Sequence, residues 1–136
     1  MMTIKILLNI FLSSFVFEYV TEQQIVLLNY KKEKCTMSSS TDTTDIKLCM
    51  EWHLDSLDIL EIIKSSRPTV FREIHILCSV WPCEYIGEVV INGKHYKYSI
   101  NAGSFMTLAM DNNTYWLIYD KESNFFLEGL WNPEMD

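Results

Sequence analysis

The sequence predicts an α+β domain in which one helix packs on an antiparallel β-meander of about six strands. Three observations support this prediction. Two alternating apolar runs flank an Asn-Gly pair, one amphipathic helical segment lies between residues 55 and 65, and residues 70–130 alternate strand-like runs with short turns. A small half-barrel closed by residues 46–52 is the variant of this fold, and a signal-like apolar helix precedes it.

Asn92-Gly93 is the clearest hairpin signal in the chain, because a type I′ turn needs a positive φ at both central positions. With this turn, Ile91 pairs with Lys94, and Glu88 lies opposite Lys97. The same register collects apolar side chains on one face, namely Tyr85, Val89, Ile91, Tyr96, Tyr98 and Ile100. The hairpin therefore predicts part of the core.

The residues before this sheet predict one strand and one helix. Residues 46–52 alternate between apolar and polar side chains, which indicates a half-buried strand. Asp55 is an N-cap candidate, with Asp58 three residues later in a capping-box position. Pro68 ends the helix, because the residue before a proline avoids the α region. We expect a helix of about three turns.

Beyond Pro68, β-branched and aromatic residues are frequent, and Gly, Asn and Asp separate the runs. This pattern predicts strands at residues 70–81, 85–91, 94–100, 105–110, 114–119 and 125–130. The connections are short, which is typical of an antiparallel meander.

Residues 1–24 have the features of a secretory signal. Lys5 precedes an apolar run over residues 6–17, and Glu18 ends this run too early for a transmembrane helix. No small-x-small cleavage site follows, so a signal anchor and a buried helix stay open as alternatives. Residues 25–45, with the polar run 36–45, are expected to be a linker or arm, and residues 46–136 the single domain.

The chain has four cysteines, and an even number behind a signal-like start predicts an oxidising compartment and two disulfides. Cys78 and Cys83 bracket a turn around Pro82 and form one candidate pair. Cys35 and Cys49 would then form the other and tie the arm to the first strand. Four cysteines allow three pairings, and buried unpaired thiols are the alternative.

The formal net charge of −7 disfavours nucleic acid and anionic membranes as partners. It favours a basic protein partner, because complementary charge speeds the encounter. A membrane is expected to be contacted only through residues 1–24, if they stay attached. The alternative is a surface that net charge simply keeps soluble.

The sequence lacks a nucleophile elbow, a Gly-rich phosphate loop and a C-x-x-C metal knuckle. His75 and Cys78 are three apart on one predicted strand and would point to opposite faces. The acid pairs Glu84 with Glu88 and Glu122 with Glu128 fit exposed strand edges as well as acid–base chemistry. We therefore expect no enzyme activity, no cofactor and no metal.

The aromatic residues outnumber what one inward face of a sheet holds, which predicts either a cover on both faces or an exposed aromatic patch. Such a patch, bordered by acids, is typical of a protein-binding surface. The candidate partner-binding residues lie in two loops and one strand: Trp81, Glu84, Asn101, Ser104, Tyr115, Trp116 and Tyr119.

Residues 90–103, VINGKHYKYSINAG, resemble a segment of small uncharacterised signal-peptide proteins of Gram-negative bacteria. The NGK-x-Y hairpin is also similar to that of small periplasmic inhibitors, including lysozyme inhibitors with a small β-barrel. The Ser-rich inhibitory loop of those inhibitors is absent, so their inhibitory residues do not transfer. The resemblance implies a secreted, non-enzymatic protein that neutralises a toxin or hydrolase.

From these observations we expect a small periplasmic or secreted binding protein, an immunity protein or inhibitor directed at a basic toxin or wall hydrolase. The alternatives are a membrane-anchored accessory protein held by its N-terminal segment and a small hydrolase that uses an acid pair or Cys78.

Overall fold

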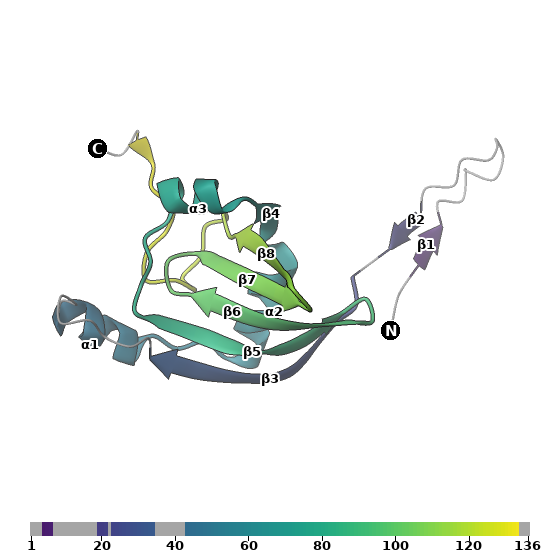
Figure 1. Ribbon diagram of the computed structural model, residues 1–136, viewed down its shortest axis with the longest axis horizontal. Coiled ribbons are helices and arrows are strands. Elements are labelled where there is room, and N and C mark those ends of the chain that lie inside the picture. Colours follow the sequence, from purple (N-terminus) through teal and green to yellow (C-terminus); the bar gives the residue numbers. More distant parts are fainter. Residues whose placement is uncertain (1–3, 7–18, 22, 35–42, 134–136) are drawn as a thin grey trace.

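The computed structural model describes residues 4–6, 19–21, 23–34 and 43–133. It has an α+β fold built on a six-stranded antiparallel sheet with the order β3-β5-β6-β7-β8-β4 (Figure 1). The strands are β3 (Ile25–Lys34), β4 (Arg67–Thr69), β5 (Cys83–Ile91), β6 (Lys94–Asn101), β7 (Phe105–Met110) and β8 (Asn113–Ile118). A separate two-stranded sheet pairs β1 (Ile4–Ile6) with β2 (Tyr19–Thr21).

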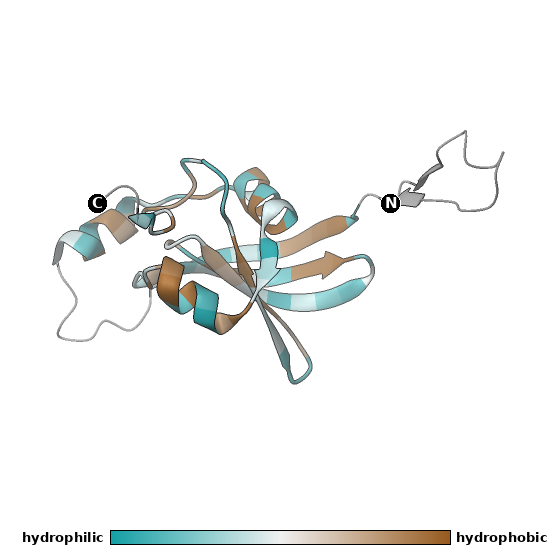
Figure 2. Ribbon diagram, turned by 90° about the horizontal axis from the view of Figure 1, so that it is seen from above, coloured by the Kyte–Doolittle hydropathy of each residue, from teal (hydrophilic) through white to brown (hydrophobic). Residues whose placement is uncertain are grey.

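Three helices accompany the sheet: α1 (Thr43–Glu51), α2 (Ser56–Ser65) and α3 (Phe71–Leu77). Helices α2 and α3 lie on opposite faces of the sheet, and α1 lies at one end (Figures 1 and 2). The main core lies between α2 and the sheet, where Ile59, Ile62, Val89 and Ile100 are completely buried. We call this side of the sheet the inner face.

The predicted hairpin is confirmed residue by residue. Ile91 pairs with Lys94, and Asn92 and Gly93 both have a positive φ. The predicted apolar face of β5 and β6 faces the core. Glu88 lies opposite Lys97 in the register, but its carboxylate accepts a hydrogen bond from Asn29 Nδ2 at 3.0 Å instead. Strand β3, which the hairpin alone did not predict, supplies this partner.

The predicted helix is also confirmed. Asp55 caps α2 by accepting from the Asp58 amide at 2.8 Å, and Asp58 accepts from the Asp55 amide at 3.0 Å. The helix ends at Ser65, and Pro68 then enters the short edge strand β4. Arg67 is already extended, because it precedes a proline. Strand β4 pairs antiparallel with β8.

Two predicted strands are wrong, because both segments are helical. Residues 46–52 belong mostly to α1, which buries only Cys49, and residues 71–77 form α3. In α3, Ile74 is buried while Leu77 and Cys78 are half-buried. This i, i+3, i+4 spacing is that of a helix face, and it prevailed over the β-propensity of the same residues. The half-barrel closed by residues 46–52 is therefore wrong as well.

Two further segments differ from the prediction. Residues 25–34, expected as part of an arm, form β3 and pair with β5, with a register shift between Leu27 and Asn29. Residues 125–130, expected as a strand, follow an irregular path. The amides of Leu127 and Glu128 both donate to the carbonyl of Ala102, so this segment packs against a turn instead of joining the sheet edge. The six strands are thus a four-stranded meander plus β3 and β4.

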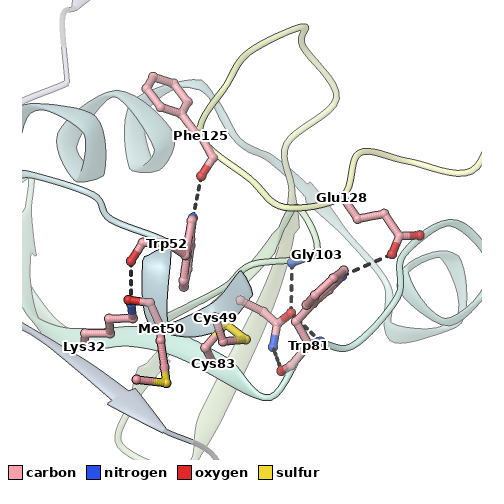
Figure 3. The surroundings of a disulfide bond; sticks show 10 residues. Lys32, Cys49, Met50, Trp52, Trp81, Cys83, Gly103, Phe125 and Glu128 are labelled. Carbon is pink, nitrogen blue, oxygen red and sulfur yellow. Dashed lines mark hydrogen bonds between the residues drawn. A yellow bond between two sulfur atoms is a disulfide. The ribbon is translucent and has the colours of Figure 1, made fainter. Parts of the chain in front are cut away.

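The disulfide joins Cys49 of α1 to Cys83 of β5, with 5.7 Å between their Cα atoms (Figure 3). The predicted pairs Cys78 with Cys83 and Cys35 with Cys49 are both wrong. Cys78 is a half-buried free thiol at the C-cap of α3. Cys35 lies outside the described residues.

Residues 7–18, the centre of the expected signal segment, also lie outside the described residues. Within the part of the chain that the structure describes, no helix is long and apolar enough to cross a bilayer.

Candidate interaction surface

The side of the sheet away from α2 is only partly covered. Its side chains follow from the strand register, which aligns one row across all six strands: Lys31, Ile86, Ser99, Thr107, Trp116 and Thr69. Five of the six are half-buried and Lys31 is exposed. Among the described helices only α3 lies on this side, at the β8 and β4 end (Figures 1 and 2). We call this row, together with Glu33 of β3 and Glu84 of β5, the open face.

The β3 side of the open face carries two facing acids beside the exposed Lys31. Glu33 of β3 lies directly opposite Glu84 of β5. Like charges in this position destabilise a sheet, so folding does not explain the pair. Glu84 is compensated in part, since it accepts a hydrogen bond from Ser99 Oγ at 3.0 Å. Further along β5, Glu88 Oε1 lies 3.4 Å from Nε2 of His95 in β6.

The opposite side of the open face is aromatic. Phe71 of α3 packs on Trp116 of β8 with 5.0 Å between ring centroids, and His75 stacks on Phe71 at 6.2 Å. Trp116 is half-buried, whereas Phe71 is 57% exposed. An exposed phenylalanine that is held in place by a tryptophan is a rigid anchor of the kind that dominates protein interfaces.

Three further apolar side chains near this part of the sequence or bonded to it are exposed, namely Ile76, Val80 and Trp131. The amide of Trp131 donates to the carbonyl of Leu77, the last residue of α3, at 2.8 Å. Beside it, burial raises the pKa of the Cys78 thiol to about 11, and the carboxylates of Glu73 and Glu128 add to this effect. A thiol in this state is a poor nucleophile.

The structure places the seven candidate partner-binding residues in four different surroundings. Glu84 and Trp116 both belong to the open face, on strands that are not neighbours. Tyr115 is exposed on the inner face, where its ring lies 6.3 Å from that of Tyr96. Trp81 is half-buried and donates its indole N–H to Glu128 at 3.1 Å (Figure 3).

The other three candidates, Asn101, Ser104 and Tyr119, are buried, so the structure does not present them to a partner. Ser104 has a φ of 76° and donates its hydroxyl to the carbonyl of Glu128 at 2.7 Å. Tyr119 packs against Phe125 and Phe126. Ser104 and Tyr119 therefore hold the C-terminal segment against the sheet.

Sequence reasoning missed Phe71, Ile86, Ser99 and Thr107. Phe71 was hidden by the strand assigned to residues 70–81. The other three lie on confirmed strands, but only the order of the strands aligns them in one row.

No group of three or more His, Cys, Asp or Glu side chains within the described ranges is placed to hold a metal ion. Comparisons with protein-family models, with curated proteins and with solved structures find no match. Function is therefore inferred from the surface itself.

Proposed function

We propose that this chain is a small secreted or periplasmic binding protein without enzyme activity, which neutralises a basic toxin or hydrolase as an immunity protein or inhibitor. The observation that carries the proposal is the composition of the open face. It places a pair of facing carboxylates, Glu33 and Glu84, across the sheet from the aromatic anchor of Phe71 and Trp116.

This combination suits a partner that is both basic and apolar at its contact surface. An arginine or lysine of the partner would relieve the repulsion between Glu33 and Glu84, so the energy lost within the sheet is recovered on binding. Phe71 would supply apolar area at low entropic cost, because its neighbours already restrict the ring. The hydroxyls of Ser99 and Thr107 lie between these two regions and can adapt to polar groups of the partner.

Two further observations support the class of protein. The net charge of −7 favours a basic partner over the whole surface. The Cys49–Cys83 disulfide is compatible with an extracellular or periplasmic location. The resemblance of residues 90–103 to periplasmic inhibitors supports the same class.

The test is affinity capture from a periplasmic extract with the full chain, followed by an assay of the captured protein. Phe71→Ala removes the aromatic ring of the proposed contact, and Glu84→Gln removes one of its two carboxylates. Glu61→Gln, on the exposed side of α2, is the matched control.

We expect wild type and Glu61→Gln to retain a basic protein that high salt releases, and both open-face variants to lose it. The toxicity or hydrolase activity of that protein should fall on addition of wild type and not of the variants. Capture of the same protein by Glu84→Gln and Phe71→Ala, or no inhibition on binding, would reject the proposal.

A further inference from the structure

Helix α3 carries the aromatic anchor of the open face, but little in the helix itself keeps it in place. It has seven residues, and a helix of this length is not stable in isolation. Its N-cap residue, Val70, makes no side-chain capping bond, and Ile74 is its one buried side chain. The position of α3, and of Phe71 at its first residue, therefore depends on contacts with the rest of the domain.

Arg67 of the edge strand β4 contacts both α3 and the segment that follows β8. Its Nη2 atom lies 2.7 Å from Oε1 of Glu73 in α3, and its Nε donates to Oδ2 of Asp120 at 2.6 Å. A planar guanidinium presents its donors in fixed directions, so one side chain can bind two carboxylates. Arg67 therefore joins three segments of the chain at the β4 end of the sheet (Figure 1).

The contact between Phe71 and Trp116 buries too little of the Phe71 ring to fix the helix alone. The ring centroids lie 5.0 Å apart, yet Phe71 stays 57% exposed. The contact of Arg67 with Glu73 acts on the same turn of α3, two residues further along the chain. Loss of this contact removes one of the few anchors of α3, and a helix that leaves the sheet takes Phe71 away from Trp116.

We propose that Arg67 is a positioning residue of the open face: it keeps α3 docked through Glu73 and Asp120, and only the docked helix presents Phe71 to a partner. The presentation of Phe71 rests on the proposed function, whereas the docking of α3 does not. The three side chains of this contact are 36–44% exposed, so each ion pair is weak and salt screens it. Helix α3 should therefore open locally while the sheet stays folded.

The first test needs no partner, because Cys78 reports the opening of α3. This thiol is half-buried at the C-cap of α3, so its alkylation by iodoacetamide in a Cys35→Ser chain should accelerate when the helix opens. Arg67→Gln should raise the rate by about threefold or more. Arg72→Gln, the same charge change at an exposed position of α3, should leave it as in wild type. The lost cation alone would raise the thiol pKa and slow the reaction.

Hydrogen exchange of the full chain measures the same opening directly. The amides of Ile74 and Cys78, whose hydrogen bonds close α3, should exchange faster in Arg67→Gln than in wild type. Glu73→Gln removes only the helix side of the contact and should have the same effect. The amides of β5 and β6 should stay protected in every variant. Alkylation and exchange rates in Arg67→Gln that equal those in Arg72→Gln would overturn the proposal.

A double-mutant cycle with the captured basic protein tests the presentation of Phe71. Arg67→Gln should weaken binding by about threefold or more in the wild-type chain and have little further effect in a Phe71→Ala chain, because the ring that Arg67 positions is already absent. An equal loss in both chains would overturn the positioning role. If wild type captures no protein, the proposed function fails, and with it the presentation of Phe71 to a partner, while the alkylation and exchange rates still decide whether Arg67 docks α3.

Discussion

The side chain of Asn101 holds both backbone polar groups of Trp81. Its Oδ1 atom accepts from the Trp81 amide at 3.0 Å, and its Nδ2 atom donates to the Trp81 carbonyl at 3.0 Å. The same Oδ1 also accepts from the amide of Gly103 at 2.9 Å. Asn101 is 4% exposed and therefore braces the loop before β5 against the turn between β6 and β7.

Asn101→Ala should destabilise the protein strongly, because it leaves the backbone groups of Trp81 and Gly103 without their partner in a buried place. Three lost hydrogen bonds to buried groups are worth about 2–4 kcal/mol in total. Urea unfolding measures this loss, and Asn124→Ala, at an exposed position, is the control. A difference between the two variants of less than about 0.5 kcal/mol would contradict the bracing role.

Gly103→Ala should prevent normal packing. A Cβ at this position would lie 1.8 Å from the carbonyl oxygen of Ser79, and a backbone atom cannot move aside cheaply. Gly129→Ala is the matched control, because a Cβ there meets nothing within 4 Å. We expect a loss of more than about 3 kcal/mol for Gly103→Ala and a change within about 0.5 kcal/mol for Gly129→Ala, both from thermal or urea unfolding. Equal stability of the two variants would show that the two loops are not in contact.

Removal of the Cys49–Cys83 disulfide should lower stability by about 3–4 kcal/mol, because the bond closes a loop with a sequence separation of 34 residues. The double variant Cys49→Ala, Cys83→Ala tests this in urea unfolding with and without a reductant. Reductant should destabilise wild type and leave the double variant unchanged. Cys78→Ser should behave as wild type in both conditions. The pairing is wrong if Cys78→Ser loses the response to reductant.

Cys78 should react slowly with iodoacetamide near neutral pH. Burial raises its pKa from 9.0 to about 11, so less thiolate is present at any pH below this value. Mass spectrometry at Cys78 should show a rate that keeps rising past pH 9.0 and levels off near 11. The same chain unfolded in urea should level off near the ordinary value. Identical pH profiles for the folded and unfolded chains would contradict the buried environment.

Glu33→Lys should stabilise the folded protein, because it replaces the repulsion with Glu84 by an attraction across the two strands. The expected gain is about 0.5–1 kcal/mol at low salt and less at high salt. Urea unfolding at two salt concentrations measures it. Under the proposed function, the same variant should bind the basic partner more weakly. Unchanged or lower stability would show that Glu33 and Glu84 do not repel each other.

The fold was predictable where the structure of a segment depends only on neighbouring residues. The turn chemistry of Asn92-Gly93 fixed the register of β5 and β6, and the spacing of Asp55 and Asp58 fixed the start of α2. Prediction failed at residues 71–77, where strand propensity and helical spacing are both present in the same residues. It also failed for Cys49 and Cys83, because their pairing depends on where α1 lies in space.

The candidate surface shows the same division. The sequence named Glu84 and Trp116 as candidates, and the structure places both on the open face. Asn101 and Ser104 were candidates as well, but they lie in a turn that is covered by residues 125–128. Only the packed structure distinguishes a loop on the surface from a loop under another segment.

The sequence by itself determined the local structure: the hairpin with its register, the capped helix α2 and the strands β5 to β8. Turns, caps and strand alternation depend on neighbouring residues, so they are readable without the rest of the chain. The tertiary structure decided that β3 and β4 form the edges, that Cys49 meets Cys83, and that α3 leaves half of one face uncovered. These outcomes depend on contacts between residues far apart in the sequence. Local rules do not distinguish between the possible arrangements, and the free energy of packing selects one of them.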